Sequence, residues 1–346
     1  MTGPRNPALD LLRGLAVGLV LLRHALPAVF PGAGVVGIVM FFSLSGYLIT
    51  GLLTADLRVH GRVRFARFYR RRALRLAPPL LVLVIVVAVV MMTLDPLGDR
   101  SETLRTVAIA LTWTANLPLD QGSAATFHLW TLATEEQFYL LWPAVLAIGA
   151  ARDRLGLALG VTALACVGAC VATVVWLRAD PDLAYALPTS WALCFVVGGA
   201  ARILQERGSR RWCPPPGLVL LSLVTLAALS VVPLRGHAAT YLIGGPLIAV
   251  LTATCILAAT RRPAGPVLPR VAAPLVWLGT VSYAAYLWNY PLTLWLRPVA
   301  GEVVGGLAAA ALTLVAACLS WHLVEQPVHR WSRRAGAAPA LVGADR

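Results

Sequence analysis

Charged residues are scarce in this chain: they make up 13% of its 346 residues, none of them is lysine, and 59% of the residues are hydrophobic. Soluble globular domains carry about 25% charged residues, so this composition excludes that class and is typical of an integral membrane protein. The net charge of +14 consists of arginine. We expect it to report membrane topology, because nucleic-acid binding explains it poorly.

Cysteine is also too sparsely placed to carry a metal site or a disulfide framework. Five of the six cysteines lie within apolar runs, and the only close spacing is the i,i+4 pair Cys166 and Cys170. Neither a metal ligand pattern nor a disulfide pattern is present in these spacings. We expect the cysteines to pack between helices and expect no bound metal.

Long apolar runs predict an all-α, polytopic bundle of transmembrane helices. The runs cover residues 8–30, 34–54, 76–94, 155–177, 184–204, 217–234, 239–259, 273–297 and 303–324. We expect the first run to be retained as a helix, because Asp10 and Arg13 interrupt it and no convincing signal-peptide cleavage site follows. The stretch 102–150 is ambiguous, with a short apolar part at 104–118 and a second at 136–150.

The distribution of arginine decides how often residues 102–150 cross the membrane, because cytoplasmic loops carry an excess of basic residues. One net crossing places 23 of the 29 arginines on one side, whereas two crossings abolish the asymmetry. We therefore predict about ten spans in the cell membrane, a short re-entrant or interfacial helix near 104–118, and cytoplasmic termini. The membrane domain is expected at residues 1–334, with a short disordered cytoplasmic tail at 335–346.

Two ionisable residues share one face of the first apolar run. Arg13 and His24 are eleven residues apart, which is a rise of about 16 Å along an α-helix and nearly a whole number of turns. We expect Arg13 near one membrane boundary and His24 near mid-depth, where an ionisable group usually marks a functional site. The alternatives are a histidine that packs between helices and an Arg13 that pairs with Asp10 at i,i+3.

Eight arginines crowd the predicted loop between the second and third spans, at positions 58, 62, 64, 67, 70, 71, 72 and 75. A juxtamembrane basic segment attracts anionic lipids, which is one interpretation. The other is a cytoplasmic binding site for a polyphosphorylated ligand, because guanidinium groups grip phosphate oxygens in two places. Arg72 and Arg75 are spaced i,i+3 and point together if this segment is helical.

A hydroxyl group needs a general base to attack an acyl group, and histidine is the usual base near neutral pH. His24 is the candidate base. Glu135 and Glu136 are candidates to orient it. The alternatives for these glutamates are pairing with Arg100 or Arg105 and a place at the start of a helix. The developing oxyanion and the departing group then need hydrogen-bond donors or positive charge in a water-poor cavity.

Six motifs occur in a fixed order along the chain. They are Arg13 and His24 separated by ten residues, FFSLSGYLI at 41–49, the pattern RxxRxxP at Arg72, Arg75 and Pro78, HLWTLATEEQFYLLWP at 128–143, SYAAYLWNYP at 282–291, and EQP at 325–327. Over nearly the whole chain, this series resembles the membrane-bound acyltransferase family 3. Members of that family transfer acyl groups from coenzyme A thioesters to hydroxyl groups.

The resemblance implies acyl-CoA as co-substrate, no metal, and an acceptor hydroxyl on a glycan, a glycolipid or a glycosylated small molecule such as a macrolide. It implies catalytic roles for His24, Glu135 and Glu136, and donor binding by Arg13, Arg71, Arg72 and Arg75. Acceptor binding is expected from His128, Trp130, Tyr139, Ser282, Tyr286 and Asn289. The tryptophans and tyrosines among these also fit helix packing or the membrane interface.

Two departures from the family pattern affect this interpretation. Asn289 stands where the family usually has histidine, and an amide forms hydrogen bonds but cannot shuttle a proton. The chain also lacks the extra hydrolase-like domain that some members append, so we expect a standalone membrane domain. The alternative function is a transporter or flippase for a lipid-linked or glycosylated substrate, which predicts inverted repeats that the sequence does not show.

Overall fold

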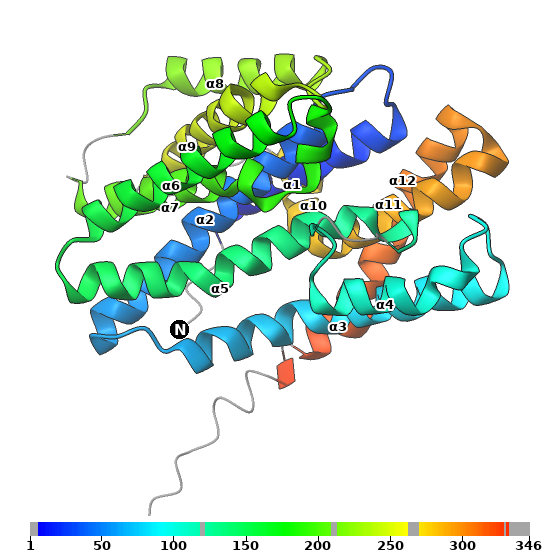
Figure 1. The fold of residues 1–346 in the computed structure, drawn as a ribbon, viewed down its shortest axis with the longest axis horizontal. Coiled ribbons are helices and arrows are strands. Elements are labelled where there is room, and N and C mark those ends of the chain that lie inside the picture. Colours follow the sequence, from blue (N-terminus) through cyan, green and yellow to red (C-terminus); the bar gives the residue numbers. More distant parts are fainter. Residues whose placement is uncertain (1–5, 118–121, 209–212, 262–269, 329, 332–346) are drawn as a thin grey trace, which may run out of the picture.

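The computed structural model describes residues 6–117, 122–208, 213–261, 270–328 and 330–331, and every regular element in these ranges is helical (Figure 1). The α-helices are α1 (Pro7–Ala25), α2 (Ala33–His60), α3 (Phe65–Thr93), α4 (Thr103–Thr112), α5 (Trp130–Ala151), α6 (Leu155–Trp176), α7 (Ala192–Arg207), α8 (Pro216–Ser230), α9 (Gly245–Arg261), α10 (Ala273–Thr280), α11 (Ser282–Ala300) and α12 (Glu302–Ser320). Short 3-10 helices are η1 (Arg100–Glu102), η2 (Ala124–Leu129), η3 (Pro181–Ala186), η4 (Pro188–Ser190) and η6 (Arg270–Ala272), and π-helical turns are η5 (Thr240–Gly244) and η7 (Trp321–Glu325). The prediction of an all-α fold is confirmed for the described residues.

Five of these helical segments are long and apolar enough to cross a membrane. They are Ala33–His60, Phe65–Thr93, Leu155–Trp176, Thr240–Thr260 and Glu302–Val328. The pair Arg270–Thr280 and Ser282–Ala300 adds a sixth if it forms one span, although it bends by 74°. The predicted count of ten spans therefore stays a prediction, as does the orientation of the termini. The expected tail at 335–346 lies outside the described residues.

The first helix is shorter than the sequence predicts. Asn6 caps α1 by accepting a hydrogen bond from the backbone N–H of Ala8 at 3.0 Å, and Pro7 occupies the first helical position. The helix ends at Ala25 rather than near residue 30, because Pro27 disfavours a helical conformation at Leu26. The 19 residues of α1 rise about 28 Å, so His24 lies in the last turn of the helix. Its expected position near mid-depth of the membrane stays a prediction.

The arginine cluster, by contrast, is helical over most of its length. The connection after α2 is short, residues 61–64, and α3 then runs without a break through residues 65–93. Gly61 ends α2 in the left-handed region with φ of 66°, which glycine adopts without strain. The 29 residues of α3 rise about 43 Å, more than a hydrocarbon core of about 30 Å, so its arginine-bearing first turns extend beyond that core.

Glycines bring two pairs of helices into backbone contact. A Cβ atom at Gly198 in α7 would overlap the carbonyl oxygen of Ser43 in α2, and one at Gly46 would overlap that of Phe195. In the same way, a Cβ atom at Gly14 in α1 would overlap the carbonyl oxygen of Leu275, and one at Gly279 in α10 would overlap that of Asp10. Small residues allow this approach, which strengthens van der Waals packing between helices in a membrane. The first two contacts fix α2 against α7, and both of these helices line the cavity described below.

Replacing Gly198 with alanine is expected to destabilise the protein by about 1–3 kcal/mol, because the added methyl group forces α2 and α7 apart. The measurement is thermal unfolding of the purified protein in detergent. Gly168→Ala in α6 is the matched control, because a Cβ there meets no atom within 4 Å. Equal melting temperatures for the two variants would contradict the assigned α2–α7 contact.

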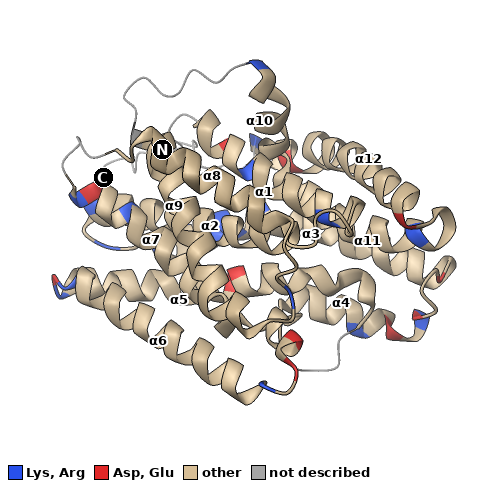
Figure 2. Cartoon of the chain, turned by 90° about the horizontal axis from the view of Figure 1, so that it is seen from above, with Lys and Arg blue, Asp and Glu red and all other residues tan. Residues whose placement is uncertain are grey.

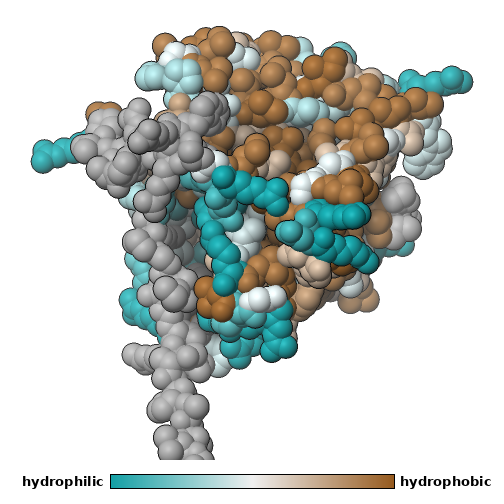
Figure 3. Space-filling view, turned by 90° about the vertical axis from the view of Figure 1, so that its left-hand side faces the viewer, coloured by the Kyte–Doolittle hydropathy of each residue, from teal (hydrophilic) through white to brown (hydrophobic). Residues whose placement is uncertain are grey.

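Charged residues gather at the helix ends and in the connections, and few lie within the helix bodies (Figure 2). The α2–α3 connection, the α5–α6 connection and the end of α7 lie at the same end of the bundle (Figure 1). We call this the arginine-rich end, because these segments include Arg58, Arg62, Arg152, Arg154 and Arg207. Hydrophilic side chains form patches on this face, among hydrophobic ones (Figure 3). The far end holds the end of α1 and the α11–α12 connection.

Candidate functional site

A cavity of about 610 Å³ lies among α1, α2, α3, α5, α7, α9 and α11. Seven of the predicted site residues line it: Arg13, Arg72, Arg75, Glu135, Tyr139, Ser282 and Tyr286. These residues come from four helices that are far apart in the sequence, so the fold brings together motifs that were recognised separately. His24, Glu136, Arg71, His128, Trp130 and Asn289 are not among the residues that line this cavity.

Arg72 is held by two residues of the following motif. Its guanidinium carbon lies 3.1 Å from the centre of the Tyr139 ring, a cation–π arrangement, and its Nε donates to Glu136 Oε1 at 3.3 Å. The Arg72 side chain is only 13% exposed. The expected alternative pairing of the glutamates with Arg100 or Arg105 is wrong, because those arginines pair with Asp95 and Glu102, respectively.

Glu135 accepts two hydrogen bonds on one oxygen atom inside the cavity. Tyr139 donates to Glu135 Oε1 at 3.0 Å, and the Ser45 hydroxyl donates to the same atom. Sequence reasoning missed Ser45, although it lies in the motif FFSLSGYLI at 41–49. Its position before Gly46, where α2 meets α7, explains why that motif needs small residues. Glu135 is thus fixed in place by neighbours on α2 and α5.

Arg75 and Arg13 supply further positive charge to the cavity. Arg75 is exposed to it and makes no hydrogen bond or ion pair with the described residues. Arg13 lies 4.0 Å from Asp10, so the predicted i,i+3 pair is confirmed, and Arg13 also lines the cavity. Arg71 is exposed on α3 outside the cavity lining, and the other members of the cluster, Arg58, Arg62, Arg64, Arg67 and Arg70, are also absent from it.

His24 belongs to a chain of hydrogen bonds at the far end of the bundle. Its Nδ1 lies 2.5 Å from Asn289 Oδ1. Asn289 Nδ2 in turn donates to Thr313 Oγ1 at 3.3 Å, while the Thr313 hydroxyl donates to the Ala309 carbonyl at 2.7 Å. Because Thr313 must accept from the amide nitrogen, the amide oxygen faces His24. Nδ1 therefore carries the proton, and Nε2 of the neutral ring is left with its lone pair.

A series of ring contacts links the cavity to His24. Tyr286 lines the cavity, and its hydroxyl donates to the His128 carbonyl at 2.8 Å and lies 2.5 Å from Thr131 Oγ1. The ring of Tyr290 lies between two histidines, with its centroid 5.2 Å from that of His24 and 5.3 Å from that of His128. His128 Nε2 donates to the Leu287 carbonyl at 3.0 Å, so its ring is fixed against α11.

Trp130 is part of the hydrophobic core. It is 1% exposed and packs against the rings of Phe42, Tyr185 and Trp191 at centroid distances of 6.2, 5.0 and 6.3 Å. The structure therefore favours the packing interpretation of this residue over acceptor binding. In the described residues, no group of three or more His, Cys, Asp or Glu side chains is arranged to hold a metal ion.

An ion pair that the motifs did not indicate lies against the rings of Tyr185 and Phe127. Arg235 donates to both carboxylate oxygens of Asp182, at 2.7 and 2.8 Å, and these hydrogen bonds raise the pKa of the guanidinium. Its guanidinium carbon also lies 4.5 Å from the Tyr185 ring centre and 5.8 Å from that of Phe127. The pair joins the α6–α7 connection to the α8–α9 connection.

Comparison with known proteins points to one family. A family model described as "Acyltransferase domain" matches residues 6–324. The chain is 29% identical to the peptidoglycan O-acetyltransferase OatA of Listeria monocytogenes, covering 94% of this chain and 56% of that protein. It is 29% identical to the putative peptidoglycan O-acetyltransferase YrhL of Bacillus subtilis, covering 93% and 54%. It is 25% identical to the O-acetyltransferase OatA of Staphylococcus aureus, covering 95% and 58%.

The chain thus spans a little over half the length of the curated relatives that it matches. No solved structure matches it. The match to the family model nevertheless extends from the capping residue of α1 into the π-helical turn at the end of α12, and it includes every cavity-lining residue.

Proposed function

This chain belongs to the membrane-bound acyltransferase family 3, and on this premise we propose that it transfers a short acyl group, such as acetyl, to a glycan hydroxyl. The protein is a multi-pass protein of the cell membrane, with several apolar helices of membrane-spanning length. The proposal of a glycan acceptor is supported by the relatives, whose names describe peptidoglycan O-acetyltransferases.

The proposed donor is acyl-CoA, bound from the arginine-rich end, which we place in the cytoplasm. The observation that carries this proposal is the cavity itself, in which Arg75 has no hydrogen-bond or ion-pair partner among the described residues and lies in the same lining as Arg72 and Arg13. Guanidinium groups bind the oxygens of a diphosphate through paired, charge-assisted hydrogen bonds. The nucleotide then stays at the arginine-rich end, while the thin acyl-pantetheine arm extends along the cavity toward Tyr286.

The proposed reaction is direct attack of the acceptor hydroxyl on the thioester carbonyl. His24 Nε2 takes the hydroxyl proton as the new C–O bond forms, the C–S bond then breaks, and the coenzyme A thiolate leaves and takes up a proton. Asn289 holds the His24 ring in the required tautomer through Nδ1. His24 does not line the cavity but is linked to it through ring contacts of Tyr286, His128 and Tyr290, so the proposed reaction requires these side chains to move aside for the thioester.

The experiment is to measure free-thiol release from acetyl-CoA by the purified protein in proteoliposomes. We expect release to require an acceptor, and we expect soluble peptidoglycan fragments to stimulate it more than a macrolide glycoside. Mass spectrometry should show the fragment heavier by one acetyl group. A protein that moves a labelled glycan across the bilayer without releasing thiol would instead be a transporter or flippase, and the proposed function would be wrong.

A further inference from the structure

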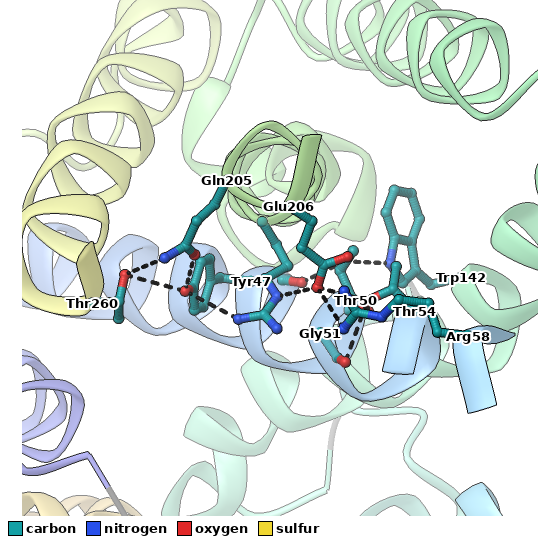
Figure 4. Close-up of polar contacts among 11 residues, drawn as sticks. Tyr47, Thr50, Gly51, Thr54, Arg58, Trp142, Gln205, Glu206 and Thr260 are labelled. Carbon is teal, nitrogen blue, oxygen red and sulfur yellow. Dashed lines mark hydrogen bonds and ion pairs between the residues drawn. The ribbon is translucent and has the colours of Figure 1, made fainter. Parts of the chain in front are cut away.

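A second polar network lines the cavity on a side that none of the donor-binding motifs reaches. It joins α2, α7 and α9 (Figure 4). The Tyr47 hydroxyl donates to Gln205 Oε1 and lies 3.2 Å from Thr260 Oγ1, and Gln205 Nε2 donates to the same Thr260 oxygen at 3.0 Å. Tyr47, Gln205 and Thr260 all line the cavity, so the network is part of its surface.

Arg202 in α7 is the cationic member of this network. Its Nε donates to Glu206 Oε1 at 2.7 Å, and one Nη donates to the Tyr47 hydroxyl at 3.3 Å. A Cβ atom at Gly51 would lie 2.8 Å from Arg202 Nε and 2.9 Å from its Cζ, so the guanidinium lies directly against the bare backbone of α2. Of its five N–H donors, three therefore have no partner among the described residues.

The carboxylate beside Arg202 is shared with other donors. Glu206 Oε1 also accepts from Thr54 Oγ1 at 3.0 Å and from Arg58 at 3.4 Å. Two guanidinium groups thus face one carboxylate, and the charge of Arg202 is only partly neutralised. Arg202 lines the cavity with its side chain 27% exposed, whereas Arg58 is 59% exposed and does not line the cavity.

The cavity therefore has two cationic sides at different depths. α7 packs against α2 and α9, whereas α3, which carries Arg72 and Arg75, packs against α4 and α11. Arg202 is five residues before the end of α7, which places it about 7 Å along the helix axis from that end. Arg75 is ten residues after the start of α3, about 15 Å along the axis from that start. Both of those helix ends lie at the arginine-rich end, so Arg202 is the shallower of the two cations.

We propose that Arg202, oriented by Glu206, Tyr47 and the bare backbone at Gly51, binds the 3′-phosphate on the ribose of coenzyme A. This inference rests on the proposed acyl-CoA donor. Coenzyme A carries two anionic groups, a central diphosphate and a phosphate on the ribose, and the ribose is farther from the thioester. A diphosphate beside Arg72 and Arg75 with the pantetheine arm pointing inward leaves the ribose phosphate near the cavity mouth, where Arg202 lies.

The test compares coenzyme A with 3′-dephospho-coenzyme A, which differs by this phosphate alone. Affinities are measured by calorimetry on the full chain in nanodiscs of zwitterionic lipid. We expect the wild-type protein to bind coenzyme A roughly ten- to a hundredfold more tightly than the dephospho compound, as for a charge-assisted hydrogen bond. Arg202→Ala should bring the ratio of the two affinities close to one. It should leave the affinity for the dephospho compound nearly unchanged.

Three further variants keep the inference falsifiable. Arg202→Lys retains a charge for Glu206 and should keep part of the ratio, and Gly51→Ala should lower it by pushing the guanidinium aside. Arg58→Ala is the matched control, because Arg58 contacts the same Glu206 oxygen outside the cavity, and it should leave the ratio as in the wild type.

The possible outcomes separate this inference from the proposed function. A wild-type protein that binds neither compound would contradict the acyl-CoA donor itself. A wild-type protein that binds both equally would retain the donor but overturn the role of Arg202. If Arg202→Ala lowers the affinity for both ligands by the same factor, Arg202 acts in helix packing or binds a lipid headgroup. The inference is then also wrong.

Discussion

Replacing His24 with alanine is expected to lower acyl transfer by about 10²–10⁴-fold, which is the usual contribution of a general base. The structure gives the reason: the Asn289 amide fixes the proton on Nδ1, so Nε2 is the basic atom of a neutral ring. The measurement is acceptor-dependent thiol release from acetyl-CoA by the purified variant. Donor affinity should change little, because His24 does not line the cavity.

Two further variants test the chain of hydrogen bonds behind His24. Asn289→Ala removes the group that sets the tautomer and should lower turnover without changing donor affinity. Thr313→Val keeps the shape of the side chain but removes the oxygen that accepts from the Asn289 amide, so its effect should have the same sign and be smaller. A His24→Ala protein that folds normally and keeps more than about a tenth of wild-type turnover would exclude His24 as the base.

Replacing Arg75 with alanine is expected to weaken coenzyme A binding roughly ten- to a hundredfold while changing the melting temperature little. Arg75 is exposed to the cavity and has no hydrogen-bond or ion-pair partner among the described residues, so we expect its loss to leave none of them unpaired. Arg75→Lys should restore only part of the affinity, because an ammonium group binds phosphate as a point charge. The measurement is calorimetric titration with coenzyme A.

Its neighbours on α3 provide the comparison. Arg72→Ala should weaken binding and also lower thermal stability, because it leaves Glu136 without its ion pair and Tyr139 without its cation. Arg71→Ala should do neither, because Arg71 is exposed outside the cavity lining. If Arg71→Ala and Arg75→Ala weaken binding equally, the cluster acts as a diffuse basic surface, and the specific role of Arg75 is wrong.

The helical class and seven of the residues that line the cavity were predictable from the sequence, because both depend on local patterns. Apolar runs of membrane-spanning length require helices, since backbone groups have no water to bond in lipid. The motif order identified Arg13, Arg72, Arg75 and Glu135, which the fold then gathers around one cavity. Spacing within a helix also gave the Asp10–Arg13 pair.

The errors arise where tertiary contacts or single residues decide the outcome. Hydropathy extended α1 past Pro27, whereas the helix ends at Ala25. The arginine side chains made residues 55–75 look like a loop, but α2 runs to His60 and α3 begins at Phe65. Arg202 was missed because it lies in no recognised motif. Its i,i+4 spacing to Glu206 was visible in the sequence, but its contact with Gly51 required the fold.

The break between α10 and α11 adds a source of positive potential that does not depend on any side chain. The 74° bend begins a new helix at Ser282, and both Ser282 and Tyr283 in its first turn line the cavity. A helix start leaves backbone N–H groups without intrahelical partners and carries a partial charge of about +0.5 from the aligned peptide dipoles. This field does not come from any one side chain, so we expect it to remain at the cavity of the Arg75→Ala protein.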